Sequence, residues 1–431
     1  MAGALLFSMM IITITITITI LLTFLKPTHS GKTTTIFSST SFSSNNHYNV
    51  PALFVIGDSS VDSGTNNFLG TLARADRLPY GRDFDTHRPT GRFSNGRIPV
   101  DYLAMRLGLP YVPTYLGQTG SVDDMVHGVN YASAGAGLIF TSGSELGQHI
   151  SFTQQVQQVT DTFQQFTLNM GEVVAADLIS KSLFYISIGT NDYIHYYLRN
   201  VSSVQSLYLP WKFNQFLVQT MKKEIENLYI ANVRKVVVAG LAPIGCAPYY
   251  LWQYRSRNGK CVQMINDMIT EFNFAVRYMV DGLNQKLQDA DIIFCDIFEG
   301  SMDIIKNHDR FGFNVTTEAC CGLGRYKGVI TCMTPEMSCK NASNHIWWDQ
   351  FHPTDTVNAI LADNFLLKEI ARSTAIYDLS AADDDQEYHH ESEIDEDVAD
   401  EIENDEQDEL DVADEIDSDD DRQSQMFMVI G

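Results

Sequence analysis

The sequence predicts an α/β fold built on a parallel, doubly wound sheet. Four short apolar runs bounded by turn residues are typical of strands buried on both faces. They are ALFVIGD (52–58), SLFYISIGTND (182–192), KVVVAGLAP (235–243) and DIIFCDIF (291–298). Segments between and after these runs repeat apolar residues at helical spacing. Strands that alternate with helices form parallel sheets covered on both faces and joined by right-handed crossovers.

Three of the later segments, at 211–233, 264–287 and 353–371, carry the helical pattern. Their apolar residues recur three or four positions apart, which places them on one face of a helix. The third segment begins with a proline and a threonine, as helix starts commonly do. The apolar positions are Phe213, Phe216, Leu217, Met221, Ile225, Ile265, Ile269, Phe272, Val276, Met279, Val357, Ile360, Leu361 and Leu367.

Polar residues stand next to these strands and helices, where an α/β sheet binds its ligands. Ser59 directly follows the first apolar run, and Asn191 lies at the end of the second. Asp349 and His352, within WWDQFHPTD, come just before the last predicted helix. Ligands of such sheets bind beyond the carboxyl ends of the strands. These four residues are therefore candidates for one site.

Ser59, His352 and Asp349 have the chemistry of a nucleophile, a base and the group that orients the base. A serine hydroxyl attacks an ester when a base takes its proton, and a carboxylate holds that base in the right tautomer. A spacing of three lets Asp349 reach Nδ1 of His352 on one helical turn or in a tight loop. Taken singly, G-D-S is typical of a turn or a helix N-cap, and D-x-x-H of a surface turn. No serine lies in a G-x-S-x-G elbow, which argues against an ordinary α/β-hydrolase.

Two further residues are candidates for hydrogen-bond donors to an oxyanion. Gly135 lies in the small-residue run of GVNYASAGAGL, where a backbone N–H can approach a substrate closely. The side-chain amide of Asn191, in SIGTNDY, can donate a second hydrogen bond. The alternative interpretations are a tight packing turn at Gly135 and an Asx turn at Asn191. The occurrence of all four motifs in this order, at strand ends, favours a catalytic site.

Together the motifs resemble the plant GDSL-motif esterase/lipase family, part of the SGNH hydrolase superfamily. The similarity runs from about Pro51 to Ala375, and it includes FVIGDSSVDSGTNN, GVNYASAGAG, SIGTND, WWDQFHPTD, GLAPIGCAP and ACCGLGRYKGVITC. It implies a flavodoxin-like three-layer α/β/α sandwich with a parallel sheet. Many relatives carry glycine where this chain has Ala134, and some have three asparagines in a row where it has the sequence GTNN at 64–67. Neither departure touches a proposed catalytic atom.

The resemblance assigns a role to each candidate residue. Ser59 is implied to be the nucleophile, His352 the general base and Asp349 the group that orients it. Ser59, Gly135 and Asn191 are implied to donate to the oxyanion. The implied reaction is hydrolysis of a carboxylic ester, of a lipid or of an acylated small molecule or polymer, through an acyl-Ser59 intermediate and without a metal or cofactor. Acyl transfer to another alcohol is a variant at the same site, and a catalytically silent glycoprotein on the same fold is the alternative from another class.

The two ends of the chain differ in composition from the expected hydrolase domain, 50–376. Residues 1–30 hold an apolar run that predicts a secretory signal peptide, with a membrane-spanning signal anchor as the alternative. Residues 31–49 are rich in Ser, Thr and Asn and predict a flexible linker. Residues 377–431 predict an acidic disordered tail, because 23 of the 54 acidic residues lie between Asp383 and Asp421 with no Lys or Arg among them. We assign this tail no function.

The distribution of charge argues against a nucleic-acid partner. The net charge is −25, but outside the tail the chain is nearly neutral and shows no basic stripe. The expected partner is a small-molecule or lipid ester, and the membrane is expected to be contacted only through the N-terminal signal segment. The sequence predicts no particular oligomeric state.

Export would explain both the sequons and the cysteines. Asn200, Asn314 and Asn341 begin Asn-X-Ser/Thr triplets and are predicted glycosylation sites. Of the seven cysteines, four lie within the segment 320–339 and predict a disulfide-pinned loop. A zinc site is the weaker alternative because no C-x-x-C pair is present. Cys295 lies in an apolar run and is expected to be a buried free thiol. We therefore expect a secreted, extracellular protein.

Overall fold

A parallel sheet of four strands, in the order β1-β2-β3-β4, forms the centre of the fold. The computed structural model describes residues 50–118, 121–199 and 203–372. Each strand comes from one predicted apolar run, and all pairs are parallel, so the carboxyl ends of the strands meet at one edge. The strands are β1 (Leu53–Gly57), β2 (Leu183–Ser187), β3 (Lys235–Ala239) and β4 (Asp291–Cys295).

The backbone of residues 127–133 continues this sheet beyond β1 without forming a regular strand. The amide of Val55 donates to the carbonyl of Val129, and the amide of Tyr131 donates back to the carbonyl of Val55. This pairing is also parallel. The second segment along the chain thus lies outside the first, which is the strand order 2-1-3-4-5 of flavodoxin-like sheets. Gly135, just past this segment, is brought to the same edge as Ser59.

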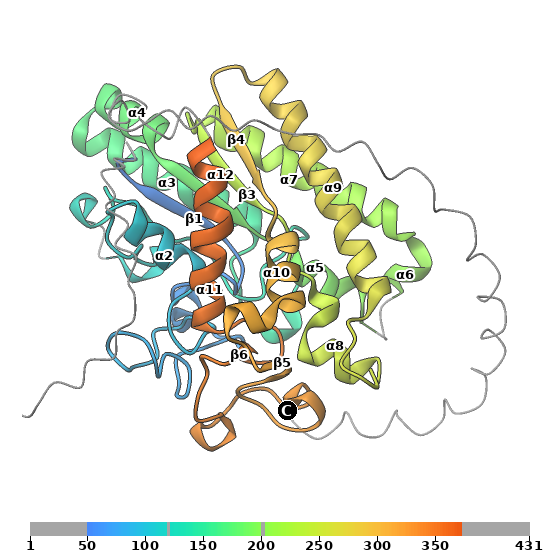
Figure 1. Ribbon diagram of the computed structural model, residues 1–431. Coiled ribbons are helices and arrows are strands. Elements are labelled where there is room, and N and C mark those ends of the chain that lie inside the picture. The colour runs from blue at the N-terminus through green and yellow to red at the C-terminus, as the bar shows by residue number, and fades with distance from the viewer. Residues whose placement is uncertain (1–49, 119–120, 200–202, 373–431) are drawn as a thin grey trace, which may run out of the picture. The chain divides into compact units, whose positions relative to one another are not determined.

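Helices cover both faces of the sheet and complete the predicted α/β/α sandwich (Figure 1). Apolar side chains of α3, α7 and α9 pack on the face that carries Phe54 and Phe184. Apolar side chains of α2 and α12 pack on the opposite face, which carries Val55 and Tyr185. The helices are α2 (Pro99–Arg106), α3 (Phe152–Met170), α4 (Glu172–Lys181), α5 (Thr190–Asp192), α6 (Val204–Leu207), α7 (Pro210–Ile230), α8 (Pro248–Gln253), α9 (Gln263–Lys286), α10 (Ile297–Lys306), α11 (Asp355–Leu361) and α12 (Leu367–Arg372).

One predicted core position differs in the structure. Phe216 of α7 is 50% exposed, whereas Phe213 and Leu217 on the same helix are buried. The buried stripe of α7 also includes Asn214 and Val218, which centres it away from Phe216. The i, i+3, i+4 pattern therefore marks the buried face but not its edges.

Three disulfides form, and Cys295 is left as a buried free thiol in β4, as expected. Burial raises the pKa of this thiol to about 12, so it stays protonated and unreactive. The bridges are Cys246–Cys261, Cys320–Cys339 and Cys321–Cys332.

The segment 320–339, which contains two of the disulfides, supports the loop that carries Asp349 and His352. Strand β5 (Val315–Ala319) leads into Cys320 and Cys321, and it pairs with β6 (His345–Trp347). The amides of Cys320 and Cys321 donate to the carbonyls of Trp347 and Trp348, at 2.9 and 2.7 Å. The disulfides thus fix the strand immediately before Asp349.

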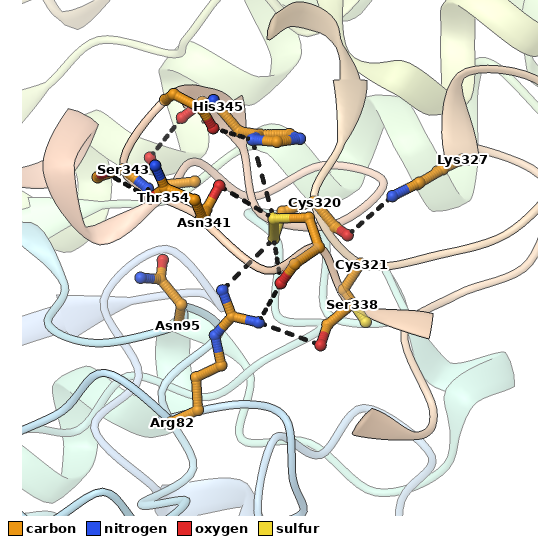
Figure 2. Close-up of a disulfide and its surroundings, with 12 residues drawn as sticks. Arg82, Asn95, Cys320, Cys321, Lys327, Ser338, Asn341, Ser343, His345 and Thr354 are labelled. Carbon is orange, nitrogen blue, oxygen red and sulfur yellow. Dashed lines mark hydrogen bonds between the residues drawn. A yellow bond between two sulfur atoms is a disulfide. The ribbon is translucent and has the colours of Figure 1, made fainter. Parts of the chain in front are cut away.

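A second loop, which carries Arg82, is tied to the Cys320–Cys339 disulfide. Figure 2 shows the guanidinium of Arg82 at this bridge, where Nη1 donates to the carbonyl of Cys339 at 2.5 Å and to the hydroxyl of Ser338 at 3.1 Å. Arg82 lies two residues after Tyr80, which reaches the candidate site described below. The Cys320–Cys339 bridge therefore anchors both sides of that site.

Several predicted features lie outside the described residues. They are the signal segment 1–30, the linker 31–49, the sequon residue Asn200 and the acidic tail 377–431. Within the described ranges, no helix combines the length and apolar character needed to cross a bilayer. Asn314 and Asn341 are both exposed.

Candidate active site

Ser59 stands in the turn after β1, at the carboxyl edge of the sheet. A glycine is required just before it, because a Cβ on Gly57 would lie 2.4 Å from the carbonyl oxygen of Ser187. The turn is closed by the amide of Val61, which donates to the carbonyl of Asp58 at 3.2 Å. Ser59 is left half-buried in the wall of a pocket of about 470 Å³.

His352 and Asp349 lie in the loop between β6 and α11 and complete a hydrogen-bonded chain with Ser59. Nε2 of His352 is 2.8 Å from Oγ of Ser59, although 293 residues separate them in sequence. Nδ1 of His352 is 2.8 and 3.0 Å from the two carboxylate oxygens of Asp349. The amides of Phe351 and His352 also donate to Oδ1 of Asp349, so the loop's own backbone orients the carboxylate.

The electrostatics of the pair keep the carboxylate charged and make the imidazole more basic. Burial alone would raise the pKa of Asp349, but the charge of His352 and the loop hydrogen bonds outweigh it and lower that pKa. Burial would lower the pKa of His352, but Asp349, helped by Asp58, outweighs it and raises that pKa above 6.5. With Asp349 ionised, Nδ1 carries the proton and Nε2 is free to accept one from Ser59.

Tyr80 holds the second oxygen of the Asp349 carboxylate. Its buried hydroxyl donates to Oδ2 of Asp349 at 2.8 Å. Its ring packs edge-on against Phe93 and Trp348, and Phe93 in turn lies against the ring of His352. Tyr80 is therefore a positioning residue, which sequence reasoning did not identify because it lies 269 residues from Asp349.

Tyr80→Phe should lower the free energy of unfolding by about 1–3 kcal/mol, because a buried carboxylate loses a hydrogen bond. The unshared charge of Asp349 should also raise the pKa of His352 further and move the acid limb of the pH–rate profile to higher pH. Denaturant unfolding and pH-dependent ester hydrolysis measure the two effects. The exposed Tyr278→Phe on α9 is the matched control. A Tyr80→Phe enzyme with the wild-type acid limb would remove Tyr80 from this role.

The three residues expected to donate hydrogen bonds to an oxyanion, Ser59, Gly135 and Asn191, all line one pocket. The backbone N–H groups of Ser59 and Gly135 donate to no other group of the described residues. Gly135 has φ of +88°, a conformation that other residues rarely adopt. Asn191 donates to the carbonyl of Ala136 at 2.9 Å, which fixes its amide and leaves its second N–H for the pocket.

Two residues of the first motif hold the segment that presents Gly135. The carboxylate of Asp62 accepts from the amide of Ala134 at 3.2 Å. The amide of Asn66 donates to the carbonyl of Ala134 at 2.8 Å. Burial raises the pKa of Asp62 to about 6, although bonds from backbone amides act against it. Asp62 and Asn66 both lie in the motif GDSSVDSGTNN, but the sequence alone does not show that they bind the backbone of Ala134.

Asp192 plays the same part beside Asn191. It is fully buried and accepts from the amides of Leu138 and Ile139 at 2.7 and 2.9 Å and from the hydroxyl of Ser142 at 2.6 Å. These bonds tie the segment after Gly135 to the turn after β2. The segments that carry Gly135 and Asn191, two of the candidate oxyanion donors, are thus held to each other.

Comparison with known proteins decides the family. Residues 53–365 match the model of the GDSL-like Lipase/Acylhydrolase family. The chain belongs to this family. Relatives from Arabidopsis thaliana include GDSL esterase/lipase At1g71691, 42% identical over 73% of this chain and 80% of the relative. GDSL esterase/lipase At5g08460 is 39% identical over 72% of this chain and 82% of that relative. GDSL esterase/lipase 7 is 40% identical over 77% of this chain and 92% of that relative. The GDSL protein described here is accordingly a carboxylic ester hydrolase of the serine hydrolase class.

Proposed function

We propose that this GDSL hydrolase cleaves its ester by nucleophilic attack of Ser59. His352 Nε2 takes the proton from Oγ as Oγ bonds to the ester carbonyl carbon. The carbonyl oxygen becomes negative and accepts hydrogen bonds from the N–H groups of Ser59 and Gly135 and from the amide of Asn191. The observation that carries the proposal is the hydrogen-bonded chain from Ser59 through His352 to Asp349.

The proposed second half of the reaction returns Ser59 to its starting state. The C–O bond to the alcohol breaks, and His352 gives its proton to the departing oxygen, which leaves an acyl-Ser59 ester. Water, deprotonated by His352, then attacks the carbonyl carbon of this ester. The C–O bond to Ser59 breaks, His352 gives its proton back to Oγ, and the acid is released. Hydrolysis of p-nitrophenyl esters tests the function, with a burst of nitrophenol expected where deacylation is slow. A folded protein that turns over none of these esters would contradict it.

We also propose that the protein is secreted, with residues 1–30 as a cleaved signal peptide and 50–376 as the hydrolase domain. The three disulfides and the exposed sequon residues Asn314 and Asn341 support an oxidising compartment. We propose Asn200 as a further glycosylation site. N-terminal sequencing of the mature protein and glycan mapping test these assignments, and an N-terminus at Met1 would contradict cleavage.

Asn191→Ala should reduce kcat by about 10²–10³-fold, because one donor to the oxyanion is removed. KM should change little, since the lost bond forms in the transition state. Steady-state kinetics measure both parameters. Asn227→Ala, which removes an amide bonded to Glu224 on the remote helix α7, is the matched control. An equal loss in both variants would contradict the role of Asn191.

The value of kcat/KM should fall as the pH drops, with a midpoint above 6.5. Protonated His352 cannot take the Ser59 proton, and Asp349 and Asp58 raise the pKa of His352 above 6.5. The pH at which kcat/KM falls to half of its maximum is therefore expected above 6.5. Initial rates between about pH 5 and 8, with circular dichroism to exclude unfolding, measure it. A flat profile over this range would rule out a titrating base.

A further inference from the structure

The Cys320–Cys339 disulfide is open to solvent on one side only. Cys339 is partly exposed, whereas Cys320 is 0% exposed. The neighbouring bridge is closed on both sides, because Cys321 and Cys332 are each 0% exposed. A thiolate cleaves a disulfide by attacking one of its sulfurs, so the rate depends on access to that sulfur. A thiol from solvent would therefore meet Cys339, and Cys320 would be the departing sulfur.

A positive charge lies beside the departing sulfur. Nη2 of Arg82 is 3.8 Å from Sγ of Cys320, and Figure 2 shows the guanidinium reaching this bridge. Asp83 pairs with Nε of the same guanidinium, which leaves Nη2 for the sulfur. Nζ of Lys327 brings a second cation, because it donates to the carbonyl of Cys320 at 3.2 Å. Nearby cations stabilise a thiolate, and a thiol of lower pKa departs faster.

The exposed sulfur has no such charge beside it. Nδ1 of His345 lies 3.8 Å from Sγ of Cys339. Burial, and after it the charge of Lys327, lower the pKa of His345, so this ring is neutral at neutral pH. The two sulfurs of the bridge therefore differ both in access and in charge, and both differences favour departure of Cys320.

The Cys246–Cys261 bridge is an intermediate case. Cys261 is partly exposed and Cys246 is buried. The side-chain amide of Asn266 donates to Sγ of Cys246 at 3.3 Å. A neutral amide stabilises a thiolate less than a charged donor does. This bridge should therefore open more slowly than the bridge beside Arg82.

We propose that Cys339 is a site of reversible modification by small thiols. The thiolate of the small thiol attacks Sγ of Cys339, and the bond to Sγ of Cys320 breaks with its electron pair on Cys320, beside Arg82. The products are a mixed disulfide on Cys339 and a thiolate on Cys320, so the number of disulfide bonds is unchanged. Attack of this thiolate on the mixed disulfide restores the bridge and releases the small thiol.

Opening of the bridge should slow ester hydrolysis, because the bridge and the active site share their supports. Arg82 donates to the carbonyl of Cys339, and it lies two residues after Tyr80, which holds the carboxylate of Asp349. The amide of Cys320 donates to β6, just before Asp349. Loss of one hydrogen bond to the buried carboxylate corresponds to about a tenfold decrease in kcat/KM.

Incubation with glutathione, followed by alkylation of free thiols and peptide mass spectrometry, tests the site. We expect glutathione on Cys339 and an alkylated Cys320, formed at least about tenfold faster than the Cys321–Cys332 bridge opens. A bridge that resists glutathione, an adduct on Cys320, or earlier opening of another bridge would overturn the proposal. The value of kcat/KM should fall as the adduct forms. An unchanged value at full modification would overturn the link to the active site and leave the proposed hydrolysis intact.

Substitution of Arg82 tests the part played by its charge. Arg82→Met should slow modification by about tenfold, whereas Arg82→Lys keeps the charge and should react within about threefold of the wild type. Arg88→Met, at an exposed position of the same loop, is the matched control for loss of one positive charge and should react at the wild-type rate. Faster modification of both Arg82 variants would show that Arg82 shields the bridge, and would overturn its role in the departure of Cys320.

Discussion

Ser59→Ala is expected to reduce kcat by about 10⁶-fold, the largest effect of any single substitution proposed here. The hydroxyl is the only group hydrogen-bonded to Nε2 of His352 among the described residues, so alanine leaves the base with nothing to activate. The fold should persist, because the half-buried hydroxyl makes no other side-chain bond there. Hydrolysis of p-nitrophenyl butyrate and thermal unfolding measure the two quantities.

The adjacent serine is a sharp control for this prediction. The hydroxyl of Ser60 lies 3.0 Å from that of Ser187 and not toward His352. Ser60→Ala should therefore keep activity to within about tenfold, the effect of one lost hydrogen bond. If Ser60→Ala proved as inactive as Ser59→Ala, the assignment of the nucleophile within GDSS would be wrong.

Asp349→Asn is expected to reduce kcat by about 10⁴-fold with little change in the backbone. The two loop amides should still hold an amide oxygen in the place of Oδ1. The amide nitrogen then takes the place of Oδ2, 3.0 Å from Nδ1 of His352, where its N–H favours the tautomer with the proton on Nε2. The variant also lacks the negative charge that stabilises the imidazolium formed when His352 takes the Ser59 proton.

A surface carboxylate separates this effect from simple loss of charge. Asp267→Asn on α9 changes the net charge equally but lies at an exposed position. It should retain wild-type kcat. Kinetics on both variants at one pH are sufficient, and an Asp349→Asn enzyme with more than about a tenth of wild-type activity would contradict the orienting role.

The sequence allowed the sheet to be predicted where apolar residues ran without interruption. The four strands of the central sheet correspond to four such runs, since strands buried on both faces need continuous hydrophobicity. The extension at residues 127–133 could not be found in this way. Its sequence, HGVNYAS, is short and mixed, and it pairs with β1 only because the completed sheet offers an unpaired edge there.

The same contrast applies to the site. Ser59 and His352 could be paired in advance because nucleophile and base have distinctive chemistry at strand and helix boundaries. Tyr80 and Asp62 could not be assigned roles, because a tyrosine or aspartate in a loop acquires its function only from the partner that folding brings to it. Tyr80 meets Asp349, and Asp62 meets Ala134 across 72 residues.

The central claim is that His352 activates Ser59 as the nucleophile, and covalent labelling tests it most directly. The protein should be treated with a fluorophosphonate, digested and analysed by peptide mass spectrometry, in parallel with the Ser59→Ala and Ser60→Ala variants. The account predicts a single adduct on Ser59 in the wild type and in Ser60→Ala, and no adduct in Ser59→Ala. An adduct on a different serine, or a folded wild-type protein that takes no label, would contradict it.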